Sequence, residues 1–147
     1  MYTQIKSALT ELLTNSSLFQ QVYDYEPASL EAFPCATITA QSSQSSDLAT
    51  GTIMGPTQLD TYTFSIRIYY ALTTAEDEQA NNARQTAETV ILAKTDALID
   101  LLGANRSLGG MCQKLKPIAT TIGETQREQV VKYADITVQV DVVVKRI

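Results

Sequence analysis

Large side chains alternate with polar ones between residues 60 and 70, and this is the clearest pattern in the chain. One set of alternate positions carries Tyr62, Phe64, Ile66, Ile68 and Tyr70. The other set carries Thr61, Thr63, Ser65, Arg67 and Tyr69. Because successive side chains of a β-strand point to opposite faces, a period of two predicts a strand with one face toward the core. The many β-branched and aromatic residues favour the same structure.

A second alternating segment, residues 36–41, predicts the partner strand of a hairpin. Between the two strands, residues 43–58 are rich in Ser, Gln, Thr and Gly and predict a long polar loop. Connections this long within compact domains are usually functional or disordered, and apolar side chains serve no purpose in a purely flexible loop. We therefore interpret the loop as a contact with another protein, although its apolar residues folding back on their own domain is an alternative. The predicted contact residues are Asp47, Leu48, Thr50, Ile53 and Met54.

Two segments carry apolar side chains at the three- and four-residue spacing of amphipathic helices. The first is residues 2–15. The second, residues 75–102, has Thr73 or Thr74 as its N-cap, acidic residues in its first turn and Gly103 as a left-handed stop. Its stripe consists of Ala80, Ala83, Ala87, Val90, Ile91, Lys94, Leu98, Leu101 and Leu102.

Three further strands are predicted. Residues 19–25 alternate loosely, residues 114–123 form a strand bent at Pro117, and residues 129–145 carry β-branched side chains at every second position along one face. Prolines bracket residues 26–33, which predicts an irregular segment because proline disrupts both helices and central strands.

The resulting order is α-β-β-β-α-β-β within a single domain that spans residues 1–147. Local hairpins predict an α+β fold with a mainly antiparallel, possibly mixed sheet and two helices packed on one of its faces. The strand face that points toward the helices is expected to carry Phe64, Ile66, Val138 and Val140. We expect this face to contact stripe residues such as Val90 and Leu98.

Composition excludes several classes of function. Of the 147 residues, 44% are hydrophobic and 18% are charged, as in ordinary globular proteins. No apolar run approaches the roughly 20 residues of a membrane helix, and the first residues lack the pattern of a signal peptide, so we expect synthesis in the cytoplasm and no membrane contact. Because the net charge is −5 and the basic residues are scattered, we expect no tight binding of nucleic acid.

The chain offers little for catalysis or metal binding. It has no histidine, which removes the commonest general base and the commonest transition-metal ligand. Cys35 and Cys112 are far apart in sequence and are expected to be reduced, buried and without metal. Neither a phosphate-binding Gly-rich loop nor a nucleophile elbow occurs, and the acidic residues 76–78 suit a helix N-terminus. We therefore expect no enzyme activity, no catalytic residues, no cofactor and no metal.

The order of elements and several short segments resemble the tail-terminator, or tail-completion, proteins of long-tailed bacteriophages. Those proteins place an aromatic-Glu-Pro element before a Phe/Tyr-Pro-Ala strand. The matching segments are Val22-Tyr-Asp-Tyr-Glu-Pro27, Leu30-Glu-Ala-Phe-Pro34 and Ala36-Thr-Ile38. The family's Tyr-x-Phe-x-Ile strand with a following aromatic residue is matched by Tyr62, Phe64, Ile66 and Tyr69. A long helix at residues 75–102 and a C-terminal antiparallel pair at residues 114–147 extend the resemblance over the chain.

The resemblance implies a structural protein of the virion tail or neck, made in the host cytoplasm. Such proteins form a ring, usually a hexamer, that caps the tail tube, ends its polymerisation and joins the tail to the head. The implied partners are further copies of the chain, the tail tube protein and a head-completion or neck protein. DNA would pass through the lumen without specific binding, because an acidic lining does not attract it.

Three other interpretations stay open. A head-completion or neck protein, which connects head and tail in the same phages, has similar size and composition. A small α+β ligand-binding protein or enzyme would need a pocket with convergent polar groups. A monomeric adaptor would bind its partner without forming a ring.

Overall fold

The computed structural model describes residues 1–47, 57–72, 77–126 and 130–145. In chain order the elements are α1 (Tyr2–Asn15), β1 (Gln21–Tyr23), β2 (Cys35–Asp47), β3 (Thr57–Ala71), α2 (Asp77–Ala104), β4 (Lys114–Gln126) and β5 (Val130–Lys145). This is the predicted order, and it confirms the α+β class.

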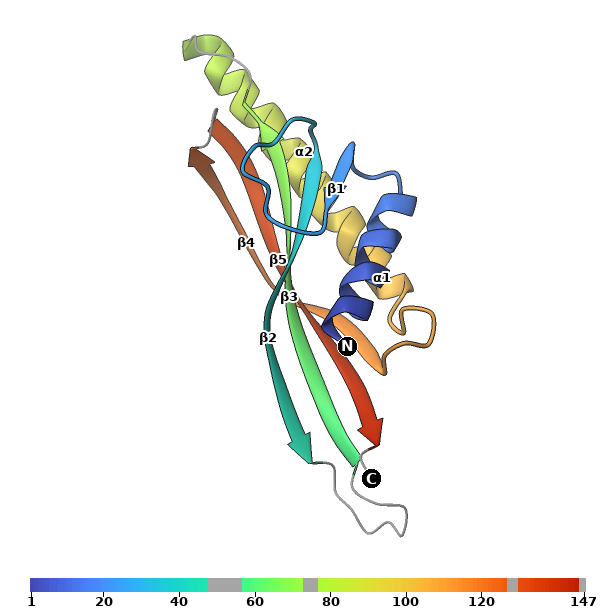
Figure 1. The fold of residues 1–147 in the computed structure, drawn as a ribbon. Helices are drawn as coiled ribbons and strands as arrows, with labels where there is room; N and C mark the ends of the chain where they lie inside the picture. Colours follow the sequence, from blue (N-terminus) through green and yellow to red (C-terminus); the bar gives the residue numbers. More distant parts are fainter. Residues whose placement is uncertain (48–56, 73–76, 127–129, 146–147) are drawn as a thin grey trace.

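The strands form one sheet in the order β1-β2-β3-β5-β4. β1 and β2 run parallel and the other neighbouring pairs are antiparallel, so the sheet is mixed but mainly antiparallel. The central pair, β3 and β5, keeps an unbroken register from Thr57 opposite Lys145 to Ala71 opposite Val131. Figure 1 shows the long strands running along an elongated molecule, with β2, β3 and β5 continuing past α1 at one end.

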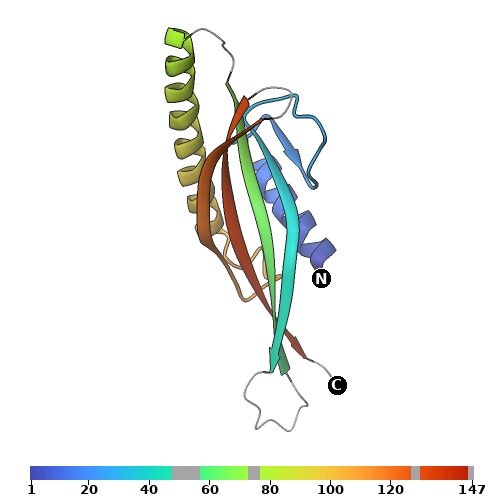
Figure 2. The ribbon, with the colours of Figure 1, turned by 90° about the vertical axis from the view of Figure 1, so that its left-hand side faces the viewer.

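Both helices pack on one face of the sheet, because each has an apolar side. The helical residues in the main core are Ile5, Leu9 and Leu13 of α1 and Ile91, Leu98 and Leu102 of α2, all fully buried. Figure 2 shows α2 as a layer beside the sheet. The N-terminal helix ends where predicted, because Ser17 adopts a positive φ of 60° and the Ser16 hydroxyl donates to the carbonyl of Leu13.

The sheet face toward the helices is the one that the sequence predicts. Fully buried side chains in the same cluster as Leu98 are Phe64, Ile66, Val138 and Val140. Val90, which the sequence also places at this contact, is half-buried, whereas its neighbour Ile91 is fully buried in the cluster. The period of two in β3 and β5 therefore assigns the two faces of the sheet correctly. The helical pattern does not determine which of two adjacent residues of α2, Val90 or Ile91, points most directly to the core.

The opposite face of the sheet has a small core of its own, which the sequence patterns do not predict. Its buried members are Leu30, Cys35, Tyr69, Ala71 and Val131, with Tyr23, Phe33 and Tyr133 packed against them. The irregular chain between the parallel strands β1 and β2, residues 24–34, crosses over this face (Figure 1). We call it the crossing segment. Its cis peptide bond joins Phe33 and Pro34.

The predicted polar loop is wrong at both ends. β2 continues to Asp47 and β3 begins at Thr57, so residues 43–47 and 57–58 belong to strands. Ser and Gln are weak strand formers on their own, but strand preference depends mostly on the neighbouring strands, and here each of these residues has a partner in a continuous ladder. The central part of the predicted loop, residues 48–56, lies outside the described residues.

Other element ends also differ from the prediction. β1 occupies only the middle of the predicted strand, and β4 extends to Gln126. Gly103 is not the left-handed stop of α2, because the helix continues through Ala104 and positive φ angles occur further on, at Leu108, Gly109 and Gly110. The Asn105 side-chain amide instead donates to the carbonyl of Leu101 over 2.9 Å. The N-cap predicted at Thr73 or Thr74 lies outside the described residues.

Both outer long strands are irregular at the same level of the sheet. The register shifts lie between Ala40 and Ser42 in β2 and between Pro117 and Ala119 in β4. Both flank the row in which Phe64 faces Val138 across the central pair. Bulges of this kind bend a strand and increase its local twist, which agrees with the bend predicted at Pro117.

Replacing Phe64 by Ala tests the main core. Phe64 is fully buried, and we expect the cavity to lower the free energy of unfolding by about 3–5 kcal/mol. Urea denaturation followed by circular dichroism measures the loss. Ile118→Ala is the matched control, because this apolar strand residue is 47% exposed, and its loss should stay within about 0.5 kcal/mol. Equal losses in the two variants would contradict the assignment of the core.

Candidate assembly surface

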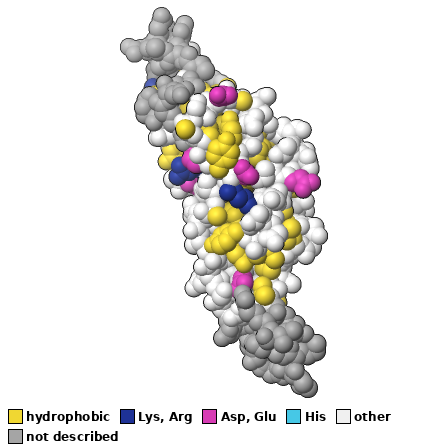
Figure 3. Space-filling model, in the orientation of Figure 1, with side chains coloured by type: hydrophobic (Ala, Val, Ile, Leu, Met, Phe, Trp, Pro, Cys, Tyr) yellow, Lys and Arg dark blue, Asp and Glu magenta, His cyan; other side chains and the backbone are white. Residues whose placement is uncertain are grey.

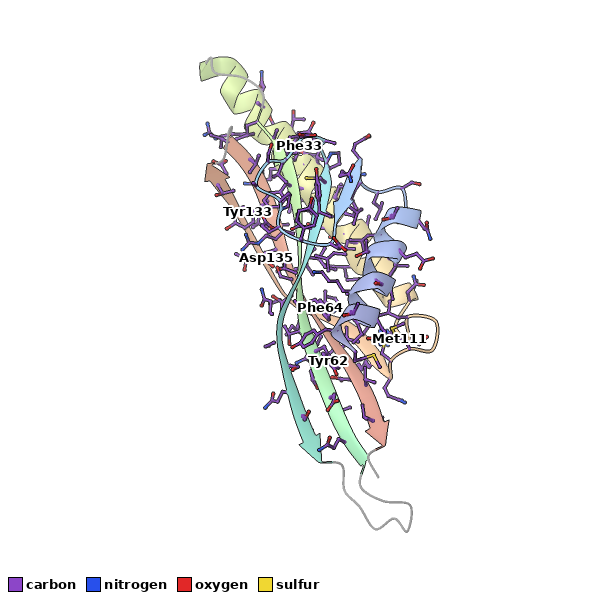
Figure 4. All side chains as sticks on the ribbon, viewed as in Figure 1. Phe33, Tyr62, Phe64, Met111, Tyr133 and Asp135 are labelled. Carbon is purple, nitrogen blue, oxygen red and sulfur yellow. The ribbon has the colours of Figure 1, made fainter. Side chains whose placement is uncertain are left out.

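Three strands continue beyond the helices and form an arm, which consists of residues 42–47, 57–61 and 141–145. Tyr2 of α1 contacts Tyr62 edge to face, with ring centroids 4.8 Å apart. Figure 4 places Tyr62 near the start of α1 and shows strands alone continuing from this level toward the arm. The helical layer therefore ends at this aromatic pair, and the arm projects beyond it.

Side-chain hydrogen bonds join the strands of the arm in addition to the backbone ladder. Ser45 Oγ donates to Asp60 Oδ1 over 2.6 Å, which links β2 to β3. Thr61 Oγ1 donates to Asp141 Oδ1 over 2.9 Å, which links β3 to β5. Asp60 is only 5% exposed, and a buried carboxylate requires such donors. The arm is therefore a hydrogen-bonded ribbon and not the open loop that its composition predicts.

The predicted contact residues lie at the far end of this arm or beyond the described part of the chain. Asp47 is the last residue of β2 and lies opposite Gln58 of β3. The other predicted contacts, Leu48, Thr50, Ile53 and Met54, fall outside the described residues. They belong to the segment that connects β2 to β3, and in the sequence they come directly after the end of β2 in the arm.

The two edges of the sheet differ in how they are protected. On the outer side of β2, β1 pairs only with residues 35–37, and the described residues provide no strand beside residues 38–47. β4 forms the other edge along its whole length. Natural edge strands are usually protected against pairing by Lys, Pro or bulges. The first half of β4 has all three, with Lys114, Lys116, Pro117 and the bulge after Pro117. Residues 38–46 have a bulge after Ala40 but contain neither charge nor proline.

Charged residues on the face opposite the helices neutralise one another. Arg67 Nε donates to Asp135 Oδ2 over 2.9 Å, and Ser65 Oγ donates to Asp135 Oδ1 over 2.6 Å. The guanidinium also lies 5.6 Å from the centre of the Tyr133 ring. Hydrogen bonds with Tyr69 and Asp135 raise the pKa of Arg67 further above its usual range. On the side of the molecule that Figure 3 shows, Lys and Arg side chains are few and separated.

Glu26 fastens the crossing segment to the sheet. The Tyr69 hydroxyl donates to Glu26 Oε1 over 2.6 Å, and Thr37 Oγ1 donates to Glu26 Oε2 over 3.0 Å. Burial first, and then the Glu26 carboxylate, raises the pKa of the Tyr69 hydroxyl, because both disfavour the phenolate. The sequence shows the Glu-Pro pair but not its partners, because these come from two strands whose register cannot be read from either strand alone.

Two shallow depressions lie along α1. One, of about 260 Å³, faces the turn after α2, and its lining includes Glu11, Asn15 and Asn105. The other, of about 340 Å³, lies beside the first turns of α1 and includes Lys6 and Asp24. The described lining residues of neither depression include a cysteine or a pair of carboxylates, so neither resembles a site for acid–base or thiol catalysis.

The described residues also show no constellation for a metal. Within these ranges, no three side chains of His, Cys, Asp and Glu are grouped to hold an ion. Cys35 and Cys112 are buried thiols, as predicted, and burial together with the charge of Asp141 raises the pKa of Cys112. Among the described helices, none has the length and apolar character that a membrane span requires.

The described surface thus offers a projecting arm and two open sheet edges as its most distinctive features. The chain matches no protein-family model, and no curated protein matches it. Fold class, surface and sequence resemblance are therefore the basis for assigning a function.

Replacing Tyr69 by Phe tests the attachment of the crossing segment. The variant leaves one Glu26 oxygen without this donor, so we expect a loss of about 1–3 kcal/mol in unfolding free energy at pH 7. The raised pKa means that the folded state holds the phenol proton more tightly than the unfolded state does. The contribution of this proton to the free energy of unfolding is complete below the ordinary pKa of 10.0. It is lost as the pH rises through the pKa of Tyr69 in the folded state.

The native protein should therefore lose more stability than Tyr69→Phe when the pH rises above 10.0. Urea denaturation at a series of pH values measures this difference. Tyr70→Phe is the control, because Tyr70 lies next in the strand but packs against the helix-side core. Parallel pH curves for the native protein and Tyr69→Phe would show that this hydroxyl does not hold the segment.

Proposed function

We propose that this protein is a phage tail terminator, a structural protein whose copies form a ring that caps the tail tube and joins it to the head. The observation that carries the proposal is the arm, a hydrogen-bonded ribbon that extends beyond the helical layer and has exposed polar side chains along β2. A domain without partners gains little from three strands that continue past its helices. A protein that ends a polymer needs such a projection to contact the last subunit.

The sheet edges support the ring. Closed rings are built from heterologous contacts, in which two different patches of each copy meet. β2 and β4 lie at opposite sides of the sheet and differ in sequence and protection, so they provide two different patches on one molecule. With a net charge of −5, a ring of such copies would let DNA pass without holding it.

The tail tube is the proposed partner of the arm. The contact residues proposed for it are Asp47, Leu48, Thr50, Ile53 and Met54, which start at the end of β2 and continue into the connection to β3. Burying one apolar side chain of this size contributes about 1.5–3 kcal/mol, and symmetric copies add their contributions through avidity. A head-completion or neck protein would bind the opposite side of the ring.

Two other functions are less well supported. A head-completion or neck protein shares the need for a ring, but its task does not call for a projection that contacts the end of a tube. A ligand-binding protein or an enzyme needs a pocket with convergent polar groups. The two depressions along α1 are shallow, and their described lining residues offer no such convergence.

Replacing Leu48, Ile53 and Met54 by Ser together tests the proposed tube contact. The variant loses three apolar side chains from the connection between β2 and β3. We expect it to stay folded, because both described core clusters consist of other residues, but to fail to cap tubes. In the phage that encodes the protein, electron microscopy should then show tails longer than normal or tails without heads.

The control carries Ala49→Ser and Thr52→Ser in the same connection and should give tails of normal length. Circular dichroism of both purified variants separates loss of contact from loss of fold. If the triple variant unfolds, these residues belong to the core of their own domain. If it folds and tails keep normal length and attachment, this segment is not the contact.

DNA binding provides a separate test. We expect no salt-dependent affinity for duplex DNA at physiological ionic strength, because tight electrostatic binding requires clustered basic residues. Fluorescence anisotropy with a labelled duplex, measured from low to high salt, detects such binding. A submicromolar dissociation constant that weakens steeply with salt would contradict a lumen that lets DNA pass freely.

A further inference from the structure

We infer that neighbouring copies join edge to edge, with residues 38–46 of β2 in one copy pairing antiparallel with residues 119–126 of β4 in the next. The two sheets would become one continuous sheet across the subunit boundary. The inference rests on the proposed function, because it specifies how the ring closes.

The two segments are the parts of the sheet edges that have the least protection by charge and proline. In β2, residues 40–46 are all exposed, and beyond the three residues that β1 covers the outer side is open in the described structure. In β4, the charged and proline-containing first half ends at the register shift, and residues 119–126 contain a single charged side chain, Glu124. Ile122 in this half is 40% exposed. An added strand satisfies open backbone groups and covers this side chain.

Strand direction favours this pairing. β2, β3, β5 and β4 are antiparallel at each step, so β2 and β4 run in opposite directions within one copy. When two copies share one orientation, β4 of the first and β2 of the second are therefore antiparallel as well. The alternation of the sheet continues across the boundary, and the helices of both copies stay on the same side.

The charges at one end of the two segments are complementary. The bulge in β2 permits a register in which opposed side chains share a face, with residues 38–40 opposite 126–124 and residues 42–46 opposite 123–119. Beyond the bulge in β4, this register brings the position of Asp47 level with Pro117, next to Lys116. The rest of the free part of β2 is uncharged, so no like charges meet along the pairing. Opposite charges at a boundary fix the register of an interface more than they add affinity.

A two-fold pairing of β2 with β2 is the main alternative. It would also be antiparallel, but it would close after two copies and leave β4 open. Ile122 would then remain 40% exposed. Pairing of β2 with β4 uses both open edges of every copy, which is the requirement for a heterologous contact that repeats around a ring.

A disulfide cross-link tests the pairing. In the inferred register, Gln44 of one copy lies opposite Thr121 of the next. Both side chains are exposed and lie on the sheet face opposite the helices. The full-length protein with Gln44→Cys and Thr121→Cys is oxidised with copper–phenanthroline over a range of concentrations and run on a non-reducing denaturing gel. We expect a ladder that continues beyond the dimer in the double variant and is absent from the native chain, whose two cysteines are buried.

Single variants and charge variants distinguish the alternatives. Gln44→Cys alone should give no ladder, and dimers as abundant as in the double variant, without trimers, would overturn the inference in favour of the two-fold pairing. Adding Lys116→Glu to the double variant should abolish the bands beyond the dimer. Adding Lys6→Glu, the same charge change on α1, should keep them. Monomers alone at every concentration, or a ladder that survives Lys116→Glu, would contradict the pairing or its register.

The cross-link and the tail-length experiment can fail separately. A ladder together with normal tails in the triple variant of the arm would keep the edge-to-edge pairing and reject the terminator function. Defective tails without a ladder would keep the function and require another ring contact.

Discussion

The pairing of β3 with β5 is the constraint on which the rest of the structure depends. These central strands face each other without a register shift from Thr57 to Ala71, and every other layer is attached to them. Because side chains alternate between faces, one register places Phe64 beside Val138 under the helices and Arg67 beside Asp135 on the other face. A slip by one residue would exchange the two faces, exposing the core and burying the ion pair.

The face opposite the helices is more than a solvated surface. Near β1 it carries an apolar cluster under the crossing segment, and next to this cluster lie the bonds from Arg67 and Ser65 to Asp135. Glu26 connects the crossing segment to both strands beneath it, through Thr37 of β2 and Tyr69 of β3. The crossing segment is irregular and does not pair with the strands through a backbone ladder. The two hydrogen bonds to the Glu26 carboxylate attach it to the sheet instead. Sheet stability on this side depends on polar geometry as well as on apolar area.

Local pattern predicts those parts of the fold where it is strong. The element order, α1, the inward face of β3 and β5 and the irregular crossing segment follow from periodicity and from Pro27 and Pro34. The far half of β2 does not, because Ser and Gln form a strand only when β3 and β5 lie alongside. Gly103 carries a stop signal, but α2 continues one residue further, through Ala104. Long-range pairing is therefore decisive for the far half of β2.

The candidate assembly surface shows the same division. The sequence predicts Asp47 and the apolar residues after it as a contact, and Asp47 is the last residue of β2. The sequence could not show the open edges, because an edge is defined by strand order, and strand order comes from register. The partners of Glu26 and Asp135 were missed for the same reason.

The paired irregularities in β2 and β4 have a mechanical consequence. Both edges are lengthened by one residue at the level of Phe64 and Val138, while the central strands remain in step. Edges that are longer than the centre force a sheet to coil, so the direction in which the arm leaves the body is set at this single row. Deleting one residue at either bulge would change the angle between the arm and the body at that row, while the residues at the tip of the arm stay the same. Single-residue insertions and deletions at the bulges would thus change the diameter of the assembly that the arm contacts, although they lie far from the contact itself.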